Sequence, residues 1–155
     1  MKVYLVRHAH AGQRSHDGRD IYRQLSPEGQ QRAIDLVQVL ADRPVDALMT
    51  SPATRCVQTL EPLAAARQLP LVEYQELWEG SSIADAISAL EGSAVDAVVA
   101  CSHGDIIPSL VDTLASRGAS ITGRGCELGS IWALEYQDGQ WVSASYVNST
   151  NGVLA

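Results

Sequence analysis

The chain alternates short apolar runs with segments of helical periodicity, and this alternation restricts its possible folds more than any other feature. Because each strand–helix–strand unit makes its two strands parallel, the pattern predicts an α/β fold, a three-layer α/β/α sandwich with a mostly parallel central sheet. A hairpin is expected to close the sheet, since Asp138-Gly139 separates the last two runs. The expected strands are Lys2–Val6, Val45–Met49, Pro70–Val72, Val95–Cys101, Ser130–Tyr136 and Trp141–Val147.

Serine–proline pairs mark the expected starts of the first two helices. Ser26-Pro27 is typical of an N-cap followed by proline in the first turn, and Ser51-Pro52 repeats this signal. We expect Pro62 to kink or end the second helix. Two more helices are expected at Ser82–Leu90 and Asp105–Ala115, where Asp105 is a candidate cap. The buried face of the first helix is predicted to carry Ala33, Ile34, Val37, Leu40 and Ala41.

Length and composition are typical of one globular domain spanning residues 1–155. The chain is 46% hydrophobic and 19% charged, with a net charge of −7. That charge argues against nucleic acid as a partner, and the longest apolar runs are too short to cross a membrane. Three cysteines without metal-ligand spacing favour reduced thiols and a cytoplasmic location. Segments 17–25 and 118–129 are expected to be polar or glycine-rich connections, the second of them a mobile rim.

Polar residues with phosphate chemistry follow three of the apolar runs directly. Arg7-His8 comes after the first run, Arg55 follows Ser51-Pro52, and Ser102-His103-Gly104 comes after the fourth run. In open α/β sheets, ligands bind at the carboxyl ends of the strands. A neutral imidazole nitrogen can attack phosphorus, and a guanidinium matches two phosphoryl oxygens. The sequence therefore predicts a phosphate pocket at this edge of the sheet.

These blocks resemble the histidine phosphatase superfamily, whose fold is phosphoglycerate mutase-like and whose pocket holds two arginines and two histidines. The resemblance runs from about residue 1 to residue 114 through LVRHAHAGQRS, RQLSPEGQQRA, SPATRCVQT, ELWEG and CSHGD. It points to the small members without a cap, such as bacterial phosphohistidine phosphatases and the phosphatase domain of mycobacterial Nudix fusions. The family's usual Arg-His-Gly is Arg-His-Ala here, with Ala9 in the third position.

The resemblance implies roles for individual residues. His8 is expected to be the nucleophile, with its other ring nitrogen bonded to a backbone carbonyl. Arg7 and Arg55 would hold the phosphoryl oxygens, and His103 would donate a hydrogen bond or place positive charge on them. Glu79, before Gly80, is the candidate general acid; Glu76 and the absence of any carboxyl acid are the alternatives. Arg14, Arg23 and His10 are candidate substrate-binding residues or solvated loop side chains.

Other chemistries lack their motifs. No cysteine is followed six residues later by arginine, so a cysteine-dependent phosphatase loop is missing, as are P-loop and dinucleotide fingerprints. We therefore expect no metal and no cofactor. Separately, we expect the chain to be a monomer or a weak dimer. The predicted function is metal-independent phosphatase activity through a phosphohistidine intermediate. The first-choice substrate is a phosphohistidine protein. The alternatives are a phosphatase of small metabolites or nucleotides, and a catalytically silent phosphate-binding interaction module.

Overall fold

A central sheet of seven strands organises the computed structural model, which describes residues 1–147. The strand order is β3-β2-β4-β1-β6-β7-β5. Each of the six expected strands is present within two residues of its predicted bounds. The strands are β1 (Lys2–Arg7), β2 (Ala47–Thr50), β3 (Leu71–Glu73), β4 (Ala97–Ser102), β5 (Ser120–Thr122), β6 (Ile131–Gln137) and β7 (Gln140–Val147).

The sheet is mostly parallel, as the alternation predicts. β1 pairs with β4, β4 with β2, β2 with β3, and β5 with β7, all in parallel, while β6 runs antiparallel to β1 and β7. Every residue of β4 is buried, as expected for a strand covered on both faces. The predicted hairpin joins β6 and β7 through Asp138 and Gly139, both with positive φ as a two-residue turn requires.

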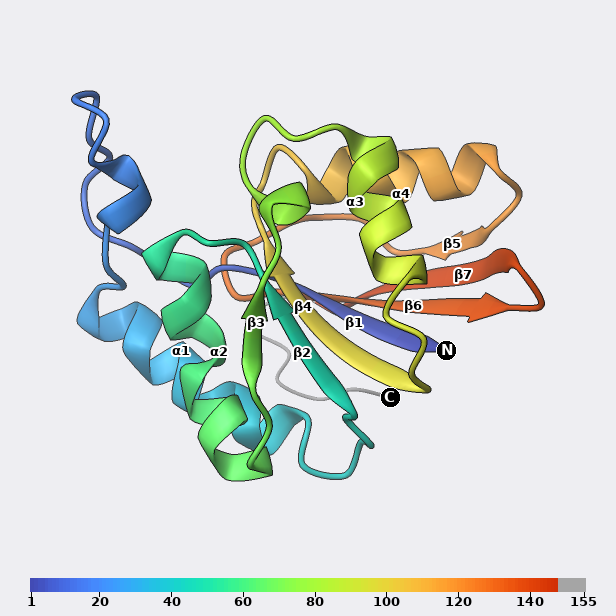
Figure 1. The fold of residues 1–155 in the computed structure, drawn as a ribbon, viewed down its shortest axis with the longest axis horizontal. Helices are drawn as coiled ribbons and strands as arrows, with labels where there is room; N and C mark the ends of the chain where they lie inside the picture. Colours follow the sequence, from blue (N-terminus) through green and yellow to red (C-terminus); the bar gives the residue numbers. More distant parts are fainter. Residues whose placement is uncertain (148–155) are drawn as a thin grey trace.

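Four helices cover the two faces of the sheet (Figure 1). The helices α1 (Pro27–Val39) and α2 (Thr54–Arg67) cover one face, and α3 (Ile83–Glu91) and α4 (Ile107–Ser116) cover the other. Alternate residues of β1 divide between two cores: Tyr4 and Val6 pack with α1 and α2, while Val3 and Leu5 pack with α3 and α4. The three-layer prediction is confirmed. Two short 3₁₀ helices, η1 (Asp20–Tyr22) and η2 (Gln75–Leu77), lie in connections.

Several local predictions were wrong. Ile34 is 54% exposed and Ala41 is also exposed, because α1 turns Leu36 inward instead. Of the two effects expected of Pro62, a kink or a helix end, the end is excluded: Pro62 lies inside α2, where Leu60 and Leu63 on either side are fully buried and hold the helix by packing. Ser26 does cap α1, accepting from the Gly29 N–H at 3.1 Å.

The segment 118–129 holds a strand that the sequence did not indicate. β5 pairs with β7 and forms the edge of the sheet, and its exposed–intermediate–exposed pattern carries no apolar run. At the end of the segment, the Gly129 N–H donates to the Arg7 and His8 carbonyls at 3.1 and 3.2 Å. In the part of the chain that the structure describes, no helix has the length and apolar character needed to cross a membrane. Residues 148–155 of the predicted domain lie outside the described range.

Candidate active site

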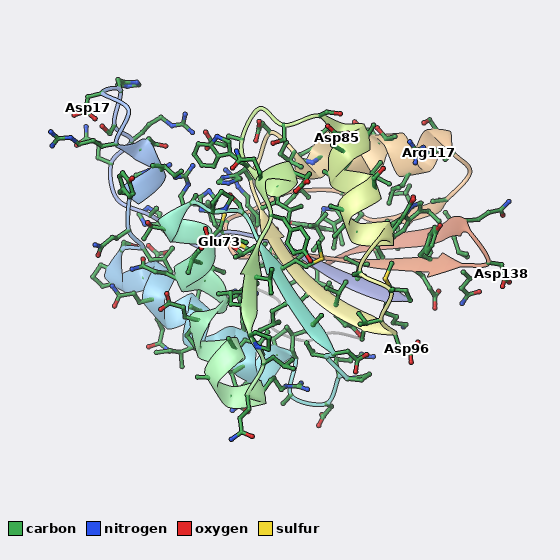
Figure 2. The ribbon with its side chains drawn as sticks, in the orientation of Figure 1. Asp17, Glu73, Asp85, Asp96, Arg117 and Asp138 are labelled. Atoms are coloured by element: carbon green, nitrogen blue, oxygen red, sulfur yellow. The ribbon has the colours of Figure 1, made fainter. Side chains whose placement is uncertain are left out.

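A polar cavity lies where β1, β2 and β4 end. Its volume is about 300 Å³. Figure 2 shows Asp96, at the amino end of β4, and Asp138, in the β6–β7 turn, at the periphery, far from this carboxyl edge of the sheet. The connections after β1, β3 and β4 supply its walls, as expected for a parallel sheet. The lining residues are Arg7, His8, Arg14, Glu79, Gly104 and Asp105.

His8 follows β1 directly and is held in one orientation. Its Nδ1 lies 2.9 Å from the carbonyl oxygen of Ala9, the type of partner that the sequence analysis expects. This bond assigns the proton to Nδ1 and leaves Nε2 with a free lone pair. Burial lowers the pKa of His8 to about 4; the Ala9 bond opposes this shift, and the Arg55 and Arg7 charges reinforce it. The ring is therefore neutral at pH 7.

His103 follows β4 and lies against His8, with 5.4 Å between ring centroids. Burial, and after it the charge of Arg55, lowers the pKa of His103 to about 2, so this ring is also neutral near pH 7. Its Nε2 lies 2.8 Å from Ser51 Oγ, and its Nδ1 lies 3.4 Å from an Arg55 nitrogen. A neutral ring can form hydrogen bonds, which is one of the two roles that the sequence analysis expects for His103.

Arg55 lies in the first turn of α2, and its side chain is fully buried. One terminal nitrogen is 2.5 Å from Glu79 Oε1, and the other donates to the Asp20 carbonyl at 2.9 Å. The Trp78 ring lies 5.6 Å from the guanidinium carbon. The sequence predicts that Ser51 caps this helix, and that is wrong. α2 begins after Ala53 without a side-chain cap, and the Ser51 hydroxyl lies 2.8 Å from His103 Nε2.

Arg7 reaches the cavity beside Gly104. One terminal nitrogen donates to the Cys126 carbonyl at 2.5 Å. A Cβ placed on Gly104 would come within 2.8 Å of the guanidinium carbon, so glycine is required here for close packing and not for an unusual φ. The Nε atoms of both Arg7 and Arg55 are buried and have no hydrogen-bond partner among residues 1–147.

Glu79 is brought to the cavity and Glu76 is not. Glu79 Oε1 lies 3.3 Å from an Arg14 nitrogen and 3.5 Å from His103 Nδ1, in addition to its contact with Arg55. Glu76 is exposed on η2 and does not line the cavity. Of the two carboxyl candidates, the geometry therefore supports Glu79.

The three other predicted substrate-binding residues have different positions. Arg14 lines the cavity with its side chain 58% exposed. Arg23 does not line the cavity; it donates to the Gly12 carbonyl at 2.9 Å and lies 3.0 Å from an Asp20 carboxylate oxygen. His10 points to the start of α1, where Nδ1 lies 2.7 Å from Ser26 Oγ. The structure thus places Arg14 alone of these three at the cavity.

Four residues that support the site were missed by sequence reasoning. Asp20 contacts Arg55, and the Ser51 hydroxyl bonds His103. The Trp78 ring packs against His103 and Arg55. Thr59 links the loop after β1 to α2. Ser51 and Thr59 lie inside the SPATRCVQT block and Trp78 lies inside ELWEG, whereas Asp20 lies outside every block. Among residues 1–147, no group of three or more His, Cys, Asp or Glu side chains could hold a metal ion.

The sequence itself carries a family signature over the same elements. Residues 3–82, just over half of the chain, match the profile of the histidine phosphatase superfamily (branch 1). The chain belongs to this superfamily. The match includes Arg7, His8, Arg55 and Glu79, and the structure adds His103 from outside the matched range.

Known relatives of this histidine phosphatase superfamily member agree with that placement. The 8-oxo-(d)GTP phosphatase of Mycolicibacterium smegmatis is 32% identical over 154 residues, which cover 94% of this chain and 48% of that protein. The chain thus spans about half the length of this relative.

Two solved structures share the fold. The protein histidine phosphatase SixA complexed with tungstate superposes with a TM-score of 0.71 at 21% identity, over 96% of this chain and 95% of that one. The α-ribazole phosphatase from Shigella flexneri gives 0.74 at 15% identity, over 100% and 98%. At these identities the likeness is one of fold, and it confirms the predicted phosphoglycerate mutase-like class.

Proposed function

We propose that this protein is a metal-independent phosphatase that transfers a phosphoryl group to His8 and then to water. The observation that carries the proposal is the state of His8, a buried neutral imidazole with Nδ1 bonded to Ala9 and Nε2 free. A neutral ring nitrogen held this way is a competent nucleophile. Two arginines lie beside it, each with a buried Nε that lacks a partner in the described part of the chain.

The first step forms an Nε2–P bond and breaks the bond from phosphorus to the leaving group. Arg7, Arg55 and a His103 N–H stabilise the charge on the three non-bridging oxygens, which persists through a loose transition state. Glu79, which takes up a proton from solvent once it leaves the Arg55 guanidinium, gives that proton to the leaving oxygen or nitrogen. Substrate oxygens compete with Glu79 for the Arg55 guanidinium, which releases the carboxyl for this proton transfer.

The second step returns the enzyme to its starting state. Glu79, now ionised, accepts a proton from a water molecule, whose oxygen attacks phosphorus in line with Nε2. The N–P bond breaks, inorganic phosphate leaves, and His8 regains its neutral form. No metal ion takes part in either step of this proposal.

The cavity favours a substrate recognised mainly by its phosphate. Its lining is charged or polar apart from Gly104, and none of the lining residues is a phenylalanine, tyrosine or tryptophan. A phosphate displayed on a protein histidine needs no surface that binds a nucleobase, so a phosphohistidine protein is the first candidate substrate. We place this activity in the cytoplasm. A nucleotide or small phosphorylated metabolite is the second candidate, because the relative that is 32% identical is an 8-oxo-(d)GTP phosphatase.

Turnover of three substrate classes with EDTA present tests the proposal. The substrates are a phosphohistidine protein, an aryl phosphate, and a set of nucleotides and sugar phosphates. We expect His8→Ala to lose hydrolysis and the acid-labile phosphoenzyme, while the exposed His16→Ala keeps both. A ~100-fold preference in kcat/KM, about 2.7 kcal/mol of transition-state stabilisation, would identify the substrate class. Phosphate binding without turnover in the unmodified protein would instead favour the silent binding module.

A further inference from the structure

Asp105 lines the cavity, yet neither the helix it precedes nor the proposed chemistry accounts for it. The sequence predicts that it caps α4, and this is wrong: α4 begins at Ile107, its N-cap is Ile106, and no side chain caps it. The amides of Ile106 and Ile107 donate instead to the His103 carbonyl at 3.2 and 3.0 Å. The Asp105 carboxylate therefore takes no part in starting α4.

The carboxylate of Asp105 is bonded to the turn that carries Glu79. Its Oδ2 accepts from the Gly80 N–H at 2.8 Å. That turn is closed by a hydrogen bond of 3.1 Å from the Ser81 N–H to the Trp78 carbonyl, and Gly80 adopts a φ of +76° within it. Glu79 and Gly80 are the two central residues, so the Asp105 bond fixes the residue next to the proposed acid.

This contact joins two separate walls of the cavity. Asp105 comes from the loop after β4, which also carries His103, and Glu79 comes from the connection between β3 and α3. Glu79 is otherwise held by side-chain contacts to Arg14 and Arg55, and substrate oxygens would compete for the latter. The backbone bond to Asp105 involves neither arginine and persists when a phosphate takes their hydrogen bonds.

We propose that Asp105 is a positioning residue that holds the Glu79 turn against the cavity, so that the acid stays within reach of the leaving group. This inference rests on the proposed function, in which Glu79 protonates the leaving atom. A carboxylate beside a phosphate site also repels the substrate's negative charge. Asp105 therefore has two separable effects, since the hydrogen bond serves proton transfer while the charge weakens phosphate binding.

Leaving-group dependence separates these effects. An alkyl phosphate needs a proton on its leaving oxygen, whereas p-nitrophenyl phosphate leaves as a stable anion, so the ratio of their kcat/KM values reports the acid. Because general acids contribute ~10²–10⁴-fold, Glu79→Gln should lower this alkyl-to-aryl ratio by about 100-fold or more. A misplaced group loses part of its effect, so Asp105→Ala should lower the ratio by about 10-fold.

The conservative variant gives the second readout. Asp105→Asn keeps an oxygen that can accept from the Gly80 N–H, so the ratio should stay within about threefold of the original. Both Asp105→Asn and Asp105→Ala remove the charge and should lower the inhibition constant of inorganic phosphate. The matched control is Asp112→Ala, which removes an exposed carboxylate on α4 and should change neither quantity.

The outcomes distinguish this inference from the proposal beneath it. If His8→Ala stays active, or Glu79→Gln leaves the alkyl-to-aryl ratio unchanged, the mechanism itself fails and the inference fails with it. If Glu79→Gln lowers the ratio while Asp105→Ala does not, the mechanism stands and Asp105 has no positioning role. An equal loss on both substrates in Asp105→Ala would also overturn the inference, because general damage to the site is not selective for the leaving group.

Discussion

His8 owes its chemistry to burial, and the same burial makes the folded protein sensitive to acid. The folded-state pKa is about 4, against 6.5 for an unperturbed histidine. Between these values the unfolded chain binds a proton at this residue that the folded protein does not bind. Stability from this group is therefore complete above pH 6.5 and is lost as the pH falls toward 4.

We expect this linkage to cost about 2 kcal/mol of unfolding free energy between pH 7 and pH 5. Urea unfolding at the two pH values, for the unmodified protein and for His8→Asn, measures it. Contributions from carboxylates and from His103 are common to both proteins and cancel in the comparison. The unmodified protein should lose about 2 kcal/mol more than the variant, and an identical pH dependence would show that His8 titrates near its ordinary pKa.

At the scale of the elements, one hydroxyl joins the loop after β1 to α2. Thr59 Oγ1 accepts from the Ala9 N–H at 3.0 Å and donates to the Arg55 carbonyl at 2.7 Å, and Thr59 is fully buried. The same Ala9 residue supplies the carbonyl that orients His8. A single side chain in the second turn of α2 thus sets the spacing between the nucleophile and the helix that carries Arg55.

Thr59→Val should test this link, because valine fills the same space without the hydroxyl. The Ala9 N–H would remain buried without its partner, at a cost of about 1–3 kcal/mol in unfolding free energy. We also expect kcat/KM to fall, since His8 moves with its loop. Thr59→Ser, which keeps the hydroxyl, should restore most of both quantities in urea unfolding and steady-state kinetics. A Thr59→Val protein as stable as the original would exclude this role.

What the sequence predicts about these elements depends on how local the signal is. Apolar runs such as β4 are continuous, so their positions are found within two residues. Ser51 has the local pattern of a helix cap, but its hydroxyl bonds His103, which is 52 residues away in the chain. Asp20 likewise meets Arg55 only through the fold, at 3.5 Å. Spacing alone does not reveal such long-range partners, which explains why the supporting residues were missed.

At the scale of the whole molecule, the negative net charge contrasts with a local cluster of arginines at the site. The chain carries a net charge of −7, yet Arg7, Arg14 and Arg55 lie together at one edge of the sheet. Attraction of a phosphate must therefore be local. The strands that precede these arginines and His103, β1, β2 and β4, are neighbours in the middle of the sheet. A ligand that joins their loops should stabilise the entire fold and not the loops alone.

A tetrahedral oxyanion should accordingly raise the melting temperature. At 100 times its dissociation constant, a ligand that binds only the folded state adds about 2.7 kcal/mol, which corresponds to about 5–10 °C for a chain of this size. Tungstate, added with EDTA present, is the probe, and each variant is compared with its own unliganded form.

Arg7→Ala should lose most of the shift in melting temperature, because it removes a guanidinium whose buried Nε has no partner in residues 1–147. Arg117→Ala removes the same charge from the exposed C-terminal end of α4, which Figure 2 shows at the periphery and which does not line the cavity, and should keep the shift. An equal shift in both variants would place the anion elsewhere, and the absence of a shift in the unmodified protein would deny that the cavity binds phosphate-like groups.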